Sequence, residues 1–193
     1  MNRPTLKIQY DSPVTLTFAL LCLLTVLLNG WTGGWTNTHL FSVYRAPLND
    51  PLTYVRMFCH VLGHSGWSHF FSNICLLLVL GPITESRYGS RNLLLSMLIT
   101  ALVSGIVYFV FFPGSALLGA SGIVFMMIFL AAVSGLRTGT IPLSLILVAL
   151  VYLGQEVYSM IFVSDSVSQL THIIGGVCGI LCGAMMPKGK RNS

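Results

Sequence analysis

Apolar residues in this chain are grouped into six long runs separated by polar or glycine-rich segments. Each run is long enough, or nearly long enough, to cross about 30 Å of hydrocarbon as an α-helix. The pattern therefore predicts an all-α polytopic membrane protein with six transmembrane helices. The predicted spans are Val14–Leu28, His69–Ile83, Leu93–Phe112, Ser121–Leu136, Ile141–Phe162 and Leu170–Met186.

The connection between the first two runs, residues 29–68, is long, whereas the other connections are short. Short connections make helices that follow one another in sequence antiparallel neighbours. The long segment is rich in aromatic residues of the kind that collect at membrane–water interfaces. We therefore expect an ordered or partly embedded loop here. The aromatic residues are Trp31, Trp35, Tyr44, Tyr54 and Trp67.

Composition supports a membrane protein. Of the 193 residues, 54% are hydrophobic and only 8% are charged, compared with about 25% charged in a typical soluble domain. The mean hydropathy is +0.82, which disfavours a soluble protein with an apolar core.

The first run follows Arg3 and Lys7, as the apolar part of a signal peptide does, but no Ala-x-Ala-like site follows it. We therefore expect a retained first helix.

Basic residues fall mostly on one side of the six-span arrangement, eight against two. Because Lys and Arg are enriched in cytoplasmic loops, we expect both termini in the cytoplasm. Residues 1–13 and 188–193 are then cytoplasmic tails of a membrane domain over residues 14–187. The formal charge of +5 is divided among loops, so we expect no nucleic-acid partner. The eight are Arg3, Lys7, Arg87, Arg91, Arg137, Lys188, Lys190 and Arg191, and the two are Arg45 and Arg56.

Cysteine and histidine spacing does not indicate a metal or a cofactor. The five cysteines form no Cys-x-x-Cys pair, and four of them lie inside predicted spans. His60, His64 and His69 are the candidates for a metal site, but no nearby carboxylate completes a set of three or four ligands. We expect these histidines to bond loop backbone. The chain also lacks an internal repeat, which disfavours a transporter.

Polar residues at the ends of spans carry the candidate chemistry. Spans two, four and six all run inward in this topology, so His69, Asn73, Ser121 and His172 share the outer leaflet. Ser121, within Gly119-Ala120-Ser121-Gly122, begins a helix, where an unsatisfied N–H and the helix dipole favour negative charge. A helix cap and close packing of small residues are the alternative reading of this motif.

An imidazole inside a membrane span is a functional candidate by default. His172 could act as the base for Ser121, or it could be a neutral histidine bonded to a neighbouring helix. His69 and Asn73 are spaced i, i+4 on one helical face, and both donate hydrogen bonds without formal charge, as oxyanion donors do. They could equally clamp two helices together. No acidic residue is well placed as a third member, so we expect a Ser–His dyad.

Taken together and in their order along the chain, these residues resemble the rhomboid intramembrane serine proteases. The resemblance covers about Leu52 to Gly179. Each motif is weak alone, but their joint occurrence, order and span placement are specific. The six spans resemble the basic prokaryotic form, which implies a bacterial plasma membrane. The matching pieces are Arg56, His60, His64, His69-Phe70-Phe71-Ser72-Asn73, Glu85-Ser86-Arg87-Tyr88-Gly89-Ser90, Gly119-Ala120-Ser121-Gly122, and His172 with Gly175 and Gly179.

The resemblance implies an endopeptidase with a rhomboid-like bundle. Ser121 would be the nucleophile and His172 its general base. The Ser121 N–H, His69 and Asn73 would form the oxyanion hole. The fifth span would gate lateral entry of transmembrane substrates from the lipid bilayer. Five further residues would shape the site: Gly119, Gly122, Phe125, Gly175 and Gly179.

Three positions depart from the family pattern. Phe125 stands where many relatives carry an aromatic hydroxyl against which the histidine stacks. Val55-Arg56 stands where Trp-Arg is common, and Thr171 replaces an alanine before the histidine. None removes the catalytic chemistry, although rate and substrate preference depend on them. The alternative is a non-catalytic rhomboid-like protein that binds membrane clients, but such proteins usually lack the serine or the histidine, and both are present here.

Overall fold

Helices make up 77% of the computed structural model, which describes residues 9–162 and 166–187. All six predicted apolar runs are helical, with bounds that differ from the prediction by a few residues. The predicted tails, 1–13 and 188–193, lie largely outside the described residues. The long helices are α1 (Pro13–Trp31), α4 (Trp67–Tyr88), α5 (Ser90–Phe111), α6 (Ser121–Thr138), α7 (Leu143–Phe162) and α8 (Ser166–Met185).

Helix boundaries follow local backbone chemistry. Pro13 is the first residue of α1, where a missing N–H costs nothing. Gly89, with φ of +80°, separates α4 from α5, and Gly139, with φ of +70°, ends α6 in the left-handed region. The sequence prediction begins α5 at Leu93, but the helix starts three residues earlier. The reason is that polar residues before an apolar run are free to extend a helix beyond the hydrocarbon.

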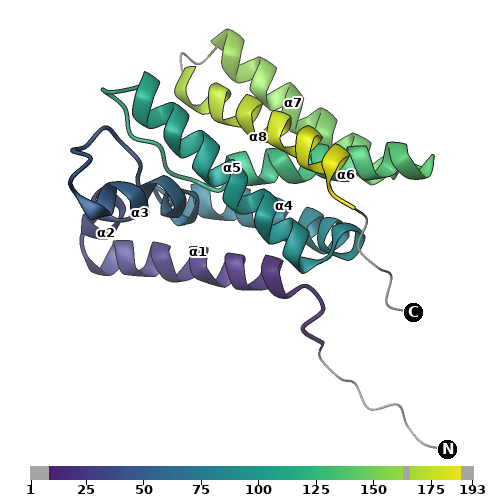
Figure 1. The fold of residues 1–193 in the computed structure, drawn as a ribbon, viewed down its shortest axis with the longest axis horizontal. Coiled ribbons are helices and arrows are strands. Elements are labelled where there is room, and N and C mark those ends of the chain that lie inside the picture. The colour runs from purple at the N-terminus through teal and green to yellow at the C-terminus, as the bar shows by residue number, and fades with distance from the viewer. Residues whose placement is uncertain (1–8, 163–165, 188–193) are drawn as a thin grey trace, which may run out of the picture.

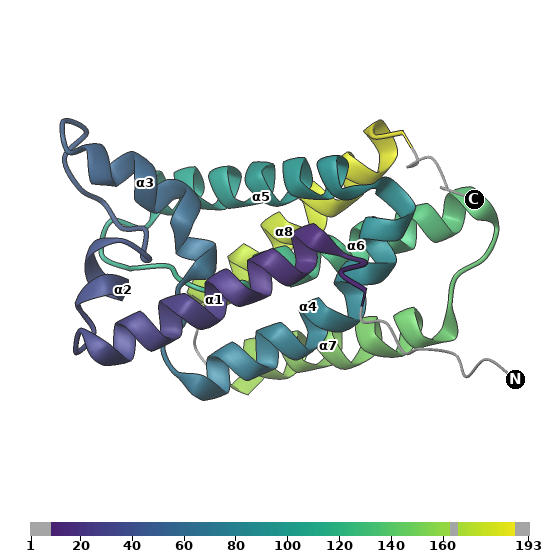
Figure 2. The same ribbon diagram turned by 90° about the horizontal axis from the view of Figure 1, so that it is seen from below.

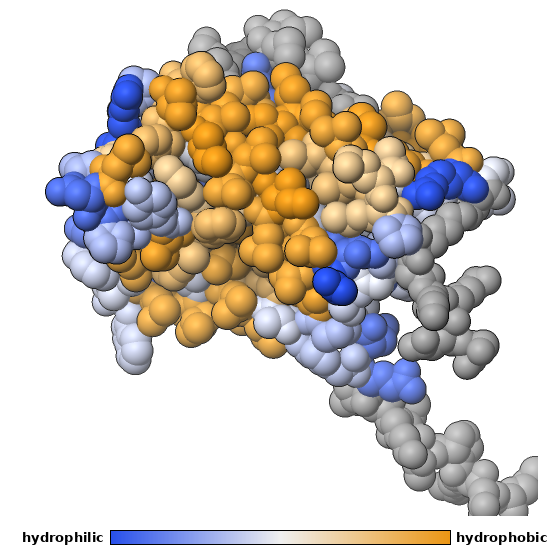
Figure 3. All heavy atoms as spheres, viewed as in Figure 1, coloured by the Kyte–Doolittle hydropathy of each residue, from blue (hydrophilic) through white to orange (hydrophobic). Residues whose placement is uncertain are grey.

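The apolar character of the helices is that of a membrane protein. By length and composition, α1, α4 and α5 can each cross a bilayer, and two shorter apolar helical segments, Ser121–Arg137 and Gln169–Met185, accompany them. The count of six spans stays a prediction. Figure 3 shows a broad apolar band across one face of the molecule, with hydrophilic residues toward its two ends. Such a band suits a bundle whose sides face lipid.

Helix α6 lies at the centre of the bundle. Its residues Gly122–Ile128 are all buried, and it packs against α4, α5 and, most extensively, α8. Helix α7 lies on the outside of the bundle in both ribbon views (Figures 1 and 2). Helix α1 begins and α8 ends at the same end of the bundle (Figure 1). The antiparallel order of neighbouring helices therefore places the starts of α4, α6 and α8 together at the opposite end.

The long connection is ordered, as predicted. It contains α2 (Trp35–His39), α3 (Pro51–Cys59) and a 3-10 turn, η1 (His60–Leu62). The buried guanidinium of Arg56 holds it together, donating to Asp50 at 2.7 Å and lying 4.7 Å from the centroid of the Tyr44 ring. This ion pair lowers the pKa of the Asp50 carboxyl. An isolated bridge between Val43 and Leu117 ties the loop to the segment before α6.

Glu85 fastens the start of α1 to the end of α4. Its carboxylate accepts hydrogen bonds from the backbone N–H groups of Val14 and Thr15, both at 3.0 Å, and from the hydroxyls of Thr15 and Ser90. The N-cap residue Ser12 makes no side-chain cap of its own. Glu85 therefore caps α1 from another helix, and its negative charge lies at the positive end of the α1 dipole.

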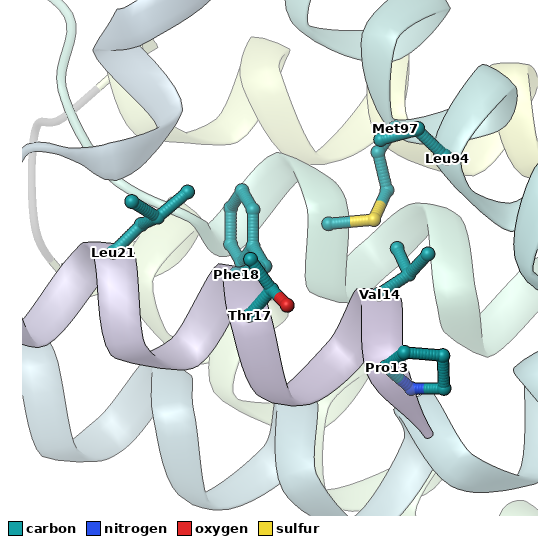
Figure 4. A pocket seen from close by; sticks show the side chains of 7 residues that line it. All are labelled: Pro13, Val14, Thr17, Phe18, Leu21, Leu94 and Met97. Carbon is teal, nitrogen blue, oxygen red and sulfur yellow. The ribbon is translucent and has the colours of Figure 1, made fainter. Parts of the chain in front are cut away.

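An apolar groove of about 260 Å³ opens between α1 and α5 (Figure 4). It lies beside the start of α1, at the opposite end of the bundle from Ser121. Helix α3 packs against α5 around Gly105, toward the end of α5 away from this groove. The groove is therefore separate from the residues that the sequence singles out. Its walls are Pro13, Val14, Thr17, Phe18, Leu21, Leu94 and Met97.

Candidate active site

Ser121 is the first residue of α6, as the sequence predicts. The first N–H groups of a helix have no carbonyl one turn earlier to bond, and they carry the positive end of the helix dipole. The turn before it is fixed by the backbone N–H of Gly119, which donates to the carbonyl of His60 at 2.9 Å. Ser121 is therefore held at a helix start by a contact with the long loop.

Gly119 brings His69 against this turn. The backbone of Gly119 has φ of +132°, which side-chain-bearing residues rarely adopt. A Cβ at this position would lie 2.8 Å from both Nε2 and Cε1 of His69. Any side chain here would displace the imidazole. The chain therefore requires glycine at position 119 both for its backbone conformation and for the space that His69 occupies.

The hydrogen bonds of His69 indicate its tautomer. The backbone N–H of Ser65 points at His69 Nδ1 at 3.4 Å, and the Ser65 hydroxyl lies 3.2 Å from the same atom. Because an N–H can only donate, Nδ1 accepts, and in a neutral ring the proton is then on Nε2. Nε2 is one of the two atoms nearest the Gly119 turn. Ser65 was not singled out from the sequence, since only the fold brings its amide to the ring.

Asn73 lies one turn after His69 on α4 and is buried. Its side-chain N–H donates to the carbonyl of His69 at 2.9 Å. A primary amide carries two N–H bonds, so this contact uses one of them and fixes the direction of the other. The predicted i, i+4 pair is therefore joined by a hydrogen bond within one face of α4.

His172 lies near the start of α8, and its side chain is only 7% exposed. Its ring stacks on Phe125, with the centroids 4.3 Å apart and the planes 7° from parallel. Phe125 is one helical turn after Ser121, so the stack brings the imidazole to the first turn of α6. On the other side of this turn, Gly119, two residues before Ser121, lies against the ring of His69. The structure thus gathers the histidines of α4 and α8 around the start of α6.

Glycines allow α8 to approach α6 at backbone distance. A Cβ at Gly175 would collide with the carbonyl oxygen of Gly122, and one at Gly179 would collide with that of Met126. At the start of this interface, Thr171 packs against Gly122. Small residues every four positions let membrane helices pack closely. This packing sets the register that places His172 over Phe125.

The rings of His60 and His64 contact backbone carbonyls, that of His64 within the loop as predicted and that of His60 in α5. The ring of His60 contacts the carbonyl of Ala101 through Nε2, and that of His64 contacts the carbonyl of Leu62 through Nδ1. Burial lowers the pKa of each imidazole to about 4, so both are neutral at pH 7. Over the described residues, no group of three His, Cys, Asp or Glu side chains is arranged to hold a metal ion.

Comparison with known proteins identifies the family of the chain. A search of curated proteins gives no match. The family model described as "Rhomboid domain" matches residues 51–189. That range begins with α3 in the long loop and includes all of the residues gathered around Ser121. Because the match covers well over half of the chain, this protein belongs to the rhomboid family.

Proposed function

We propose that this protein is an intramembrane serine endopeptidase that hydrolyses peptide bonds in or near the transmembrane helices of other membrane proteins. The observation that carries the proposal is the stacking of His172 on Phe125, one turn from Ser121. A base held beside the first turn of α6, together with a donor at the turn before it, is the arrangement that acyl transfer requires. Membership of a family of membrane-embedded proteases supports the same reaction class.

In the first half of the reaction, His172 accepts the proton of the Ser121 hydroxyl as Ser121 Oγ attacks the scissile carbonyl carbon. The carbonyl π bond opens and its oxygen becomes an oxyanion. The Ser121 backbone N–H, His69 Nε2–H and the Asn73 side chain donate to that oxygen. The C–N bond then breaks, and His172 protonates the departing amine. An acyl-enzyme on Ser121 remains.

In the second half, water attacks the acyl carbon while His172 takes its proton. Collapse of the second oxyanion breaks the ester, and the proton returns to Ser121. Phe125 supports the imidazole by its ring face and offers no hydroxyl. Gly119, Gly122, Gly175 and Gly179 shape the site by allowing α4 and α8 to reach the start of α6.

Substrates enter from the bilayer, and their helices unwind locally before cleavage. Unwinding is necessary because carbonyls within a helix are hydrogen-bonded and shielded from attack. We place both termini in the cytoplasm of a bacterial cell and the site in the outer leaflet. The orientation is supported by Arg87, Arg91 and Arg137, which lie at the end of α4, the start of α5 and the end of α6, at the end of the bundle opposite Ser121.

Labelling by a fluorophosphonate tests the nucleophile without requiring a known substrate. Folded wild-type protein should be labelled, and Ser121→Ala should not be labelled. Ser115→Ala is a matched control, because Ser115 lies in the segment before α6 and away from its first turn. Labelling of Ser121→Ala at the wild-type rate would refute the proposed nucleophile. Folded wild-type protein that binds membrane clients but is never labelled would favour the non-catalytic alternative.

A further inference from the structure

The walls of the groove between α1 and α5 are almost wholly hydrocarbon (Figure 4). Thr17 carries the one hydroxyl among the wall residues, and this hydroxyl shares a 2.8 Å hydrogen bond with that of Tyr10. Met97 is only 4% exposed and forms the floor, whereas Leu21 and Leu94 at the rim are 42% and 46% exposed. The groove is therefore open at its rim and suits a hydrocarbon occupant.

The groove extends along α1 for about the depth of one lipid leaflet. It runs from Pro13, the first residue of α1, to Leu21, which is a rise of about 12 Å at 1.5 Å per residue. Half of a hydrocarbon core about 30 Å thick is about 15 Å. An acyl chain that enters where α1 begins can therefore lie along the groove within its own leaflet.

A transmembrane helix is a poorer fit to the groove than an acyl chain. One helical turn with its side chains, about 10 Å wide and 5.4 Å long, fills roughly 400 Å³, whereas the whole groove has about 260 Å³. Membrane helices also approach one another over glycine, alanine and serine, and none of the seven wall residues is of these types. A flexible chain can follow the walls and make the dispersion contacts that a gap would lose.

Arg91 lies at the end of the groove where α1 begins. The hydroxyl of the preceding residue, Ser90, donates to Glu85, and the same carboxylate oxygen accepts from the backbone N–H of Val14 in the groove wall. Arg91 is exposed, and it precedes the wall residue Leu94 by one turn of α5. Its guanidinium is therefore carried at the level where the headgroup of a lipid in the groove would lie.

The charge of Arg91 is not neutralised within the part of the chain that the structure describes. The ion pair found there lies in the long loop. At this end of the bundle, Glu85 is occupied by hydrogen bonds to α1 and Ser90, and Asp11 is exposed and forms no ion pair with a described residue. Arg87 and Arg137 donate to backbone carbonyls, which leaves their charges in place. Three guanidiniums thus face two carboxylates, and the surplus complements an anionic headgroup.

We propose that the groove between α1 and α5 binds one acyl chain of an anionic glycerophospholipid, whose phosphate pairs with Arg91. The apolar walls alone do not select among lipids, because all lipid tails are hydrocarbon. The headgroup supplies the selection: a zwitterionic headgroup carries a cation beside its phosphate, whereas an anionic headgroup presents its charge to the guanidinium uncompensated. Since the lipid contacts both helices only when they are folded together, its binding stabilises the native bundle.

Retention of lipid by the purified full-length protein in detergent, measured by native mass spectrometry, tests the role of Arg91. The probes are phosphatidylglycerol and phosphatidylcholine, and wild type should retain the first in preference. Arg91→Gln should lower retention of phosphatidylglycerol roughly fivefold, which is the effect of one basic residue at an anionic surface, and should leave phosphatidylcholine unchanged. Arg45→Gln removes an exposed arginine of the long loop and should match wild type. Equal retention by Arg91→Gln and wild type would overturn the proposal.

Blocking the groove separates it from the rest of the lipid-facing surface. Leu94→Trp puts a large ring in the groove wall, whereas Leu95→Trp puts the same ring at a neighbour outside the walls that is 41% exposed. Leu94→Trp should lower retention of phosphatidylglycerol to that of phosphatidylcholine. Added phosphatidylglycerol should raise the unfolding temperature of wild type and Leu95→Trp but not that of Leu94→Trp.

Two results with the tryptophan variants would contradict the proposal. One is equal retention of phosphatidylglycerol by Leu94→Trp and Leu95→Trp. The other is loss of self-association in Leu94→Trp with lipid retention intact, because a second copy of the chain would then occupy the groove. If Leu94→Trp does not fold, Arg91→Gln, at an exposed position, still decides the question. None of these measurements uses peptide cleavage, so their outcome is independent of the proposed function.

Discussion

The imidazole of His172 and the phenyl ring of Phe125 lie nearly parallel, with their centroids 4.3 Å apart. This relationship joins α8 to α6 one turn after Ser121. It also shows how the chain accommodates the departure from the family pattern noted at position 125. The ring is retained and the hydroxyl is absent, so Phe125 supports the imidazole by its ring face.

Replacing Phe125 should affect the reaction through the ring. Phe125→Leu should slow fluorophosphonate labelling by about 2- to 12-fold, because one aromatic contact is worth about 0.5–1.5 kcal/mol. It should also lower stability, since a buried side chain becomes smaller. Phe125→Tyr keeps the stack and should be labelled within about 2-fold of wild type. Equal labelling rates for folded Phe125→Leu and wild type would contradict a role for the stack.

The close approach of α8 to α6 predicts the cost of adding a methyl group at Gly179. A Cβ there meets the carbonyl of Met126 and the amide of Leu130, and such overpacking typically costs about 1–3 kcal/mol. Gly179→Ala should lower the thermal unfolding temperature and reduce labelling, because His172 is carried by the same helix. Gly154→Ala is the matched control: a Cβ at Gly154 meets no described atom within 4 Å. It should be neutral or slightly stabilising. Unchanged stability of Gly179→Ala would contradict the packing described.

The hydrogen bonds of Glu85, at the end of the bundle opposite Ser121, predict how its substitution changes the free energy of unfolding. Glu85→Ala removes the acceptor of two α1 amides and two hydroxyls. Each buried donor left without a partner costs about 1–3 kcal/mol, so we expect a loss of several kcal/mol. Glu85→Gln keeps one acceptor oxygen and should lose less. Ser86→Ala, at an exposed neighbour bonded only within its own helix, should stay within about 0.5 kcal/mol of wild type. A Glu85→Ala protein as stable as Ser86→Ala would exclude the capping role.

The sequence predicts the helices and the end of the bundle where the site lies, because both follow from local hydropathy and from the order of spans. The same reasoning places Ser121, His172, His69 and Asn73 together. It does not predict the contact between Phe125 and Tyr152, or that Glu85 reaches the start of α1 some 70 residues earlier. Those contacts depend on how side-chain volumes fit between helices, and no periodic pattern encodes that fit. The sequence also does not predict the tautomer of His69, because the tautomer depends on the backbone N–H of Ser65, which the loop places beside the ring.

Lowering the pH should destabilise the long loop at pH values where most carboxylates are still ionised. Burial lowers the pKa of His60 from 6.5 to about 4, so between these values the unfolded chain binds a proton that the folded chain excludes. The contribution of His60 to the free energy of unfolding is therefore complete above about pH 6.5. It decreases as the pH falls toward 4, by on the order of 3 kcal/mol for a pKa lowered from 6.5 to about 4. His60→Gln cannot take up that proton and should lose less stability over the same range. A wild-type unfolding temperature that is flat between pH 7 and pH 5 would contradict this account.

Cleavage of a transmembrane substrate tests the central claim most directly. Wild type, Ser121→Ala and His172→Ala, each reconstituted in the same liposomes with a panel of transmembrane substrates, can be compared on one gel. The account predicts that wild type produces two fragments from at least one substrate. It predicts that both variants, with unfolding temperatures near that of wild type, lose at least about 10³-fold in rate. Cleavage by Ser121→Ala at the wild-type rate would contradict it.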